Sequence, residues 1–113
     1  MIESTIESVV TPIIPVCVPW QYSGEAMEYC VYAYSEIPDE FGDNAAGSIR
    51  YVIQLHWFFP WEPKGTSEPD IQRKKKEIRD SLFRAGFTFP TVENVGDGEW
   101  MDVVFECEIT GEV

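Results

Sequence analysis

The alternating apolar run from Ile49 to Phe59 constrains the fold of this chain more than any other segment. Large apolar side chains stand at every second position, and Arg50, Gln54 and His56 stand between them. Successive side chains of a strand point to opposite faces, so this period of two predicts a strand with one buried and one less apolar face. The residues assigned to the buried face are Ile49, Tyr51, Ile53, Leu55, Trp57 and Phe59.

Four further strands are predicted around this central one. The segment 100–109 alternates in the same way, β-forming residues fill 26–35, and neighbouring prolines hold Val16–Val18 extended. A strand over 87–95 is restricted to an edge or an end by Pro90, which cannot donate a ladder hydrogen bond. The last strand points Met101, Val103, Phe105, Cys107 and Ile109 inward, and Asp102, Glu106 and Glu108 outward.

Two helices are predicted from apolar residues at helical spacing. The first covers about residues 2–10. The second follows Ser67, which can cap it, tolerates Pro69 in its first turn, and ends at Gly86, a natural residue for the position after a helix. Its apolar face consists of Ile71, Ile78, Leu82 and Ala85, and its polar face carries Arg73, Lys74, Lys75, Lys76, Arg79 and Arg84.

The predicted order is helix, three strands, helix and two strands, with an acidic loop over 36–48. This order indicates a single α+β domain over residues 1–113, in which two helices pack on a mostly antiparallel sheet. A chain of 113 residues that is 44% hydrophobic and 14% aromatic can bury a core of its own, and its composition is unlike that of a disordered chain.

Side chains suited to catalysis or metal binding are few. The three cysteines, Cys17, Cys30 and Cys107, form no CxxC motif, which argues against a zinc site or a disulfide framework and favours a reducing cytoplasm. A small cysteine hydrolase stays a minor hypothesis, because it needs one of them within hydrogen-bond reach of His56. The segment 39–44 lacks the spacing of a calcium loop, and nucleotide-binding and hydrolase motifs are absent. We therefore expect a protein that is not an enzyme and has no cofactor or metal.

The formal net charge of −12 limits the possible partners. It excludes ordinary nucleic-acid binding through phosphate neutralisation and disfavours attraction to anionic membranes. No stretch approaches the ~20 apolar residues of a membrane span, and the first residues lack a signal-peptide pattern. The remaining explanations of the acidity are a basic protein partner, a surface that mimics DNA, or solubility alone.

The charge is segregated along the chain. Residues 70–86 hold six basic and three acidic residues, a net charge of +3, while the rest holds 17 acids against Arg50 and Lys64, a net charge of −15. One interpretation is a solvated helix with pairs such as Lys76–Asp80. The other is a two-signed surface, on which the positive helix of one copy docks against an acidic surface of the next and the contacts close into a ring.

Aromatic residues crowd one end of the central strand, next to prolines. One core can bury Trp57 and Phe59, but Phe58 and Trp61 are expected to face outward or to cover an edge. Large aromatic side chains left near a surface commonly anchor an interface, so we predict that these two lie in one.

Several motifs together resemble one family. They are Tyr34-x-x-Ile37-Pro38-x-x-Phe41-x-Asp43, Arg50-Tyr51-x-Ile53-Gln54-Leu55-His56, Lys76-x-Ile78-x-x-x-Leu82-x-x-Ala85-Gly86-Phe87 and Phe105-Glu106-Cys107-Glu108. Over about residues 26–109 the chain resembles the tail terminator, or tail-completion, proteins at the head–tail junction of long-tailed bacteriophages and prophages. The motifs are structural, and none is a catalytic signature.

The resemblance implies a homohexameric ring that ends the tail tube and joins it to the head connector or stopper protein. Its partners are then copies of itself, the tail tube protein and the connector, in the host cytoplasm during assembly and later in the virion tail. DNA passes through as cargo, and an acidic lumen keeps it from sticking. The implied lumen or interface groups are either Asp102, Glu106 and Glu108 or the acidic loop 36–43. The implied partners on the adjacent subunit are Arg73, Lys75, Lys76 and Arg79.

Two alternatives stay open. Another neck or minor tail component would share the same structural motifs. An acidic inhibitor that mimics DNA and binds a nucleic-acid enzyme would carry acids across one face without a compensating basic helix, and the run Arg73–Lys76 speaks against it.

Overall fold

The computed structural model describes residues 2–42, 45–60, 68–96 and 99–112. Its elements, in chain order, are α1 (Ile2–Val10), β1 (Cys17–Pro19), β2 (Tyr29–Gly42), β3 (Ala45–Pro60), α2 (Glu68–Arg84), β4 (Thr91–Asn94) and β5 (Trp100–Glu112). This order confirms the predicted α+β class. It also confirms both helices, with Pro69 inside the first turn of α2.

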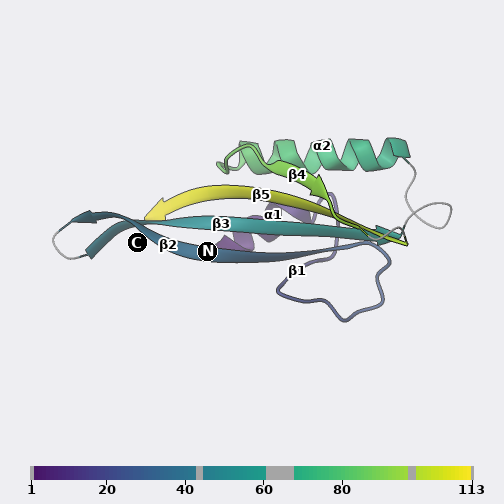
Figure 1. The fold of residues 1–113 in the computed structure, drawn as a ribbon, viewed down its shortest axis with the longest axis horizontal. Coiled ribbons are helices and arrows are strands. Elements are labelled where there is room, and N and C mark those ends of the chain that lie inside the picture. Colours follow the sequence, from purple (N-terminus) through teal and green to yellow (C-terminus); the bar gives the residue numbers. More distant parts are fainter. Residues whose placement is uncertain (1, 43–44, 61–67, 97–98, 113) are drawn as a thin grey trace.

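The five strands form one sheet in the order β1-β2-β3-β5-β4. All neighbours are antiparallel except β1 and β2, which run parallel. The molecule extends 58 × 26 × 24 Å along its principal axes. The long strands β2, β3 and β5 run side by side along its long axis (Figure 1). Since β2 and β3 keep one register from Tyr29↔Phe58 to Gly42↔Ala45, they form a single long hairpin.

Both helices bury their apolar sides against one face of the sheet, so the domain has two layers. We call this the helix face; it carries Cys30, Tyr32, Ile53, Leu55, Trp57, Phe59, Val103, Phe105 and Cys107. From α1 come Ile6 and Val10, and from α2 come Ile71, Ile78 and Leu82. The opposite side is the open face, on which Gln54, His56, Phe58, Asp102, Glu106 and Glu108 alternate with the buried residues. The alternation predicted for β3 and β5 is confirmed.

The predicted loop over 36–48 is wrong, because both strands continue through it. β2 extends to Gly42 and β3 begins at Ala45, while the start of β2 moves from residue 26 to Tyr29. Pro38 suggests a loop when read alone. The alternation of backbone groups along β2 turns its missing N–H away from β3, so the pairing of the hairpin loses no hydrogen bond there.

The predicted strand over 87–95 shortens to β4, and its first residue, Phe87, closes α2 instead. Gly86 has a φ of 106°, its N–H donates to the Phe83 carbonyl, and the N–H of Phe87 donates to Leu82. This is the hydrogen-bond pattern that ends a helix at a left-handed glycine, and it confirms the role predicted for Gly86. The proposed cap Ser67 lies outside the described residues.

Candidate functional site

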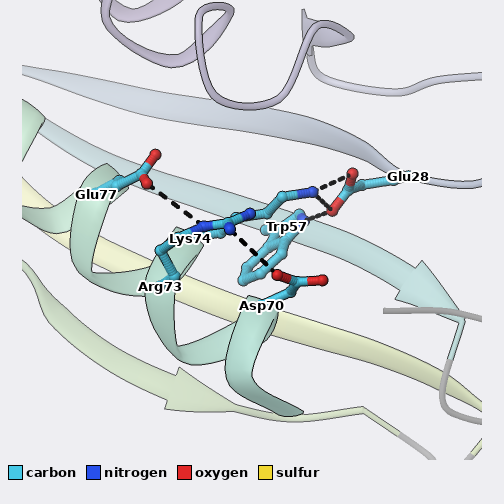
Figure 2. Close-up of polar contacts among 6 residues, drawn as sticks. All are labelled: Glu28, Trp57, Asp70, Arg73, Lys74 and Glu77. Atoms are coloured by element: carbon cyan, nitrogen blue, oxygen red, sulfur yellow. Dashed lines mark hydrogen bonds and ion pairs between the residues drawn. The ribbon is translucent and has the colours of Figure 1, made fainter. Parts of the chain in front are cut away.

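Lys74 of α2 binds within its own molecule. Its Nζ lies 2.9 and 3.1 Å from the two carboxylate oxygens of Glu28, and the indole Nε1 of Trp57 donates to the same carboxylate at 3.0 Å. Figure 2 shows this three-residue cluster beneath α2. Lys74 and Glu28 are largely buried, with side chains 21% and 24% exposed, so the cluster ties the helix to the sheet. We assign Lys74 to the fold and not to an interface.

Two more cations of α2 pair along the helix. Arg73 lies 3.3 Å from Asp70 and 3.6 Å from Glu77 (Figure 2), and Lys76 donates to Asp80 at 2.6 Å. The hydrogen bond from Lys76 lowers the pKa of the Asp80 carboxyl. The predicted Lys76–Asp80 pair is therefore confirmed. Exposed pairs of this kind contribute little to stability and leave the side chains able to exchange partners.

Arg79 belongs to a different environment at the end of α2. Its guanidinium lies 5.1 Å from the centre of the Phe89 ring, and Phe89 meets Phe83 edge to face at 5.6 Å. Both phenylalanines are more than half exposed, at 53% and 55%. With Lys75 one helical turn before Arg79, these residues form what we call the basic-aromatic corner. The sequence signal that marks Phe83 is its position off the buried stripe of Ile71, Ile78 and Leu82, which the interface prediction did not use.

The three outward-facing acids of β5 lie on the open face, away from α2. Asp102 lies 2.9 Å from Nδ1 of His56, Glu106 accepts a hydrogen bond from Gln54 at 2.8 Å, and Glu108 lies 3.3 Å from Arg50. Their partners all come from β3, the adjacent strand. The strand pairing thus brings Asp102, Glu106 and Glu108 together in one row. Within the described part of the chain, no ion pair joins this row to α2.

Phe58 lies on the open face, as predicted, inside a group of aromatic rings. It stacks on Tyr29 at 5.1 Å and on His56 at 5.8 Å, and Tyr29 also lies 6.4 Å from Trp100. Phe58 is half-buried by these neighbours. Trp61, the other aromatic interface candidate, lies outside the described residues. So do the side chains of residues 39–43 in the acidic segment, whereas Glu36 is exposed on β2.

The geometry rules out a cysteine–histidine catalytic pair. All three cysteines are buried on the helix face, while His56 lies on the open face next to Asp102. In the register of the sheet, Cys30 pairs with Trp57 and Cys107 with Ile53, both inward-facing positions. The hypothesis of a small cysteine hydrolase is therefore wrong.

The thiols are expected to be unreactive in the folded protein. Burial raises the pKa of Cys17 and of Cys107 to about 12, and that of Cys30 well above its usual value. Because the thiolate is the reactive form, an aromatic disulfide reagent at pH 8 should label none of the three within minutes, and all three in denaturant. Rapid labelling of the native protein would contradict the burial of the thiols.

The comparisons with known proteins add no assignment. The chain matches no protein-family model and no curated protein. Among the described residues, no group of three or more acidic, histidine or cysteine side chains is placed to hold a metal ion. Neither α1 nor α2 combines the length and apolarity needed to cross a bilayer, again within the described chain.

Proposed function

We propose that this chain is a structural subunit of a bacteriophage head–tail junction, in which copies join head to tail into a ring that ends the tail tube. The observation that carries the proposal is the placement of opposite charge on different sides of a two-layer domain. The basic residues Lys75, Lys76 and Arg79 lie on α2, and a row of acids lies on the open face of the sheet.

These two surfaces suit contact between copies. The sheet lies between α2 and the open face, and Asp102, Glu106 and Glu108 take their partners from β3. A second copy can bring its basic-aromatic corner to the acid row without disturbing the fold. Such a contact joins two different surfaces, so it repeats from copy to copy and gives a ring when the rotation closes.

The aromatic rings of the basic-aromatic corner add the apolar contact area that ion pairs alone do not provide. Exposed ion pairs are worth at most about 1 kcal/mol each, which is too little to hold a ring. Phe83 and Phe89 add apolar area beside Arg79, and arginine and aromatic residues are enriched among the side chains that dominate interfaces. Acidic surface left uncovered by the next copy would face the channel and repel passing DNA.

The same observations argue against a DNA-mimicking inhibitor. That function needs a surface of acids without a compensating basic helix. Here the basic α2 would be repelled by the positively charged site of a nucleic-acid enzyme.

Reversing two charges on α2 tests the assembly. In the variant Lys75→Glu/Lys76→Glu, attraction to the acid row becomes repulsion, and we expect self-association to weaken about tenfold, the equivalent of about 1.4 kcal/mol. Analytical ultracentrifugation over a concentration series, at low and at high salt, measures it. Because exposed charges are screened by salt, the wild type should also dissociate as the salt concentration rises.

A charge swap provides the matched control. Mixing that variant with Glu106→Lys/Glu108→Lys should restore mixed oligomers, while each variant alone stays weakly associated and keeps the wild-type circular dichroism spectrum. Undiminished assembly of Lys75→Glu/Lys76→Glu would overturn the charge argument. A wild type that stays monomeric at every concentration, even with tail tube protein present, would overturn the proposed function.

A further inference from the structure

Most of the outer edge of β2 has no neighbouring strand. β1 pairs only with Cys30–Tyr32, whereas β2 continues to Gly42. The last hydrogen bond on this side is donated by the N–H of Trp20 to the Tyr32 carbonyl. Backbone groups of a strand alternate in direction, so Tyr34 and Glu36 present their N–H and C=O groups to the same side. Among the described residues, no strand pairs with them there.

Trp20, the residue after β1, has an unusual backbone conformation. Its φ is 68°, and the N–H of Gln21 donates to the Pro19 carbonyl at 2.8 Å, closing a three-residue turn around it. A positive φ is a strained conformation for a bulky residue, and such turns are rare. The turn leads the chain away from the edge and leaves the indole beside it, 59% exposed and 5.4 Å from the Tyr34 ring.

A hollow lies where the edge becomes free. Its lining residues are Trp20, Ala33, Tyr34, Ser35, Val52 and Gln54. Ala33, Ser35, Val52 and Gln54 belong to the open face near the middle of β2 and β3, and Trp20 lines the hollow from beyond the edge of β2. The hollow therefore lies where an added strand would place a side chain on the open-face side.

The surroundings of this edge are acidic. Partial burial raises the pKa of the Tyr34 phenol, and so do Glu3, which accepts its hydrogen bond, and Glu36, which is exposed. An incoming strand thus meets two carboxylates beside the free backbone groups. Pro38 faces the same side without an N–H, which limits the usable edge to a short stretch around Tyr34 and Glu36.

We propose that this edge binds an extended segment of a partner protein as an added strand, with an apolar side chain in the hollow beside Trp20 and lysine or arginine next to Glu36 and Glu3. Recognition of this kind obtains affinity from main-chain hydrogen bonds and specificity from pockets for alternate side chains. The proposal goes beyond the proposed ring and does not depend on it.

A second copy of this chain does not fit the edge. Two β2 edges paired antiparallel would bring Glu36 of one copy close to the acids of the other, and like charges opposed across strands are destabilising. Outside α2, the only cations of the chain are Arg50 and Lys64, and Arg50 lies in the middle of β3, engaged with Glu108. A basic extended segment must therefore come from another protein.

A short synthetic peptide tests the proposal. The probe is acetyl-Lys-Val-Lys-Val-Lys-amide, and its control is acetyl-Glu-Val-Glu-Val-Glu-amide. Residue-resolved hydrogen exchange by NMR should show the Tyr34 and Glu36 amides slowed at least tenfold at a saturating level of the basic peptide. The Ala33 and Ser35 amides, already bonded to β3, should not change, and neither should any amide with the acidic peptide.

Two variants separate the backbone from the charge. Glu36→Pro removes one outward N–H and should weaken binding at least tenfold, while Glu36→Gln removes only the charge and should weaken it a few-fold. If Glu36→Pro does not fold, Trp20→Gly supplies the test, because glycine accepts the positive φ but leaves the hollow without its wall.

Three results would overturn the proposal. They are the absence of slowed exchange at Tyr34 and Glu36 up to millimolar basic peptide, equal protection by the acidic peptide, and unchanged binding in Trp20→Gly. Concentration-dependent protection of these amides without any peptide would instead assign the edge to a second copy. The three results that would overturn the proposal do not bear on the ring, because the ring contact uses α2 and β5 and not this edge.

Discussion

Trp57→Ala is expected to lower the free energy of unfolding by about 3–5 kcal/mol, the usual range for truncating a buried large aromatic side chain. Trp57 is fully buried at the centre of the helix face, with its ring 4.3 Å from that of Phe59. Its removal leaves a cavity beneath α2 and takes away a donor from the Glu28 carboxylate. A domain of this size has a total stability of only about 5–15 kcal/mol, so urea denaturation should show a large fall in the midpoint.

Two controls divide this effect between packing and hydrogen bonding. Trp57→Phe keeps most of the buried area but loses the bond to Glu28, and should cost about 1–3 kcal/mol. Gln54→Ala, on the open face of the same strand, should change stability by no more than about 0.5 kcal/mol. Equal costs for Trp57→Ala and Gln54→Ala would contradict the assignment of the two faces.

Ile6→Asp is expected to cost more than about 3 kcal/mol, since it places an unpaired carboxylate in the core. Ile6 lies on α1, a short helix at the start of the described chain, and its side chain is fully buried in the hydrophobic core. The result would show that α1 is part of the cooperative fold, which thermal unfolding followed by circular dichroism and tryptophan fluorescence can measure.

Ser8→Asp is the matched control, because it adds the same side chain to the exposed side of the same helix. Its expected effect is a few tenths of a kcal/mol, from a negative charge near the end of a helix. If Ile6→Asp were tolerated as well as Ser8→Asp, or if only the helical signal changed while the core remained folded, α1 would be an appendage and not a core element.

The two proposals use different parts of the molecule apart from Gln54, which lines the hollow and donates to Glu106 of the acid row. The ring contact uses the basic-aromatic corner and the acid row on β5, whereas the strand-binding edge lies on β2, on the other side of β3 in the sheet order. A subunit built in this way could contact its own copies and an unlike partner at the same time. The proposed place at a head–tail junction would require both kinds of contact.

Local patterns in the sequence predicted most of the fold. A period of two assigned the faces of β3 and β5, and helical spacing with Pro69 and Gly86 located α2. The prediction failed over 36–48, where Pro38 and glycines indicate a loop if each is considered alone. Pairing with β3 across the hairpin keeps this segment extended, and a local pattern carries no information about such a partner.

The candidate site was predictable only in part. The sequence placed Asp102, Glu106 and Glu108 on one face because alternation is a property of a single strand. It did not show that Lys74 is held by Glu28, or that Phe83 and Phe89 meet beside Arg79. Glu28 and Lys74 are distant in the chain, and Phe83 and Phe89 meet only because the chain reverses at Gly86.

The alternation that begins at Ile49 therefore determined, without any structure, which side chains of the central strand enter the core. Which side chains are buried follows from the alternation of apolar and polar residues along the strand, and this alternation can be read directly from the sequence. Only the tertiary structure decided that the opposite face stays open, that the acid row and the basic helix lie on different sides, and that most of the outer edge of β2 has no neighbouring strand. These features depend on which elements pack together and where β1 ends, and hydrogen bonds between distant segments set both.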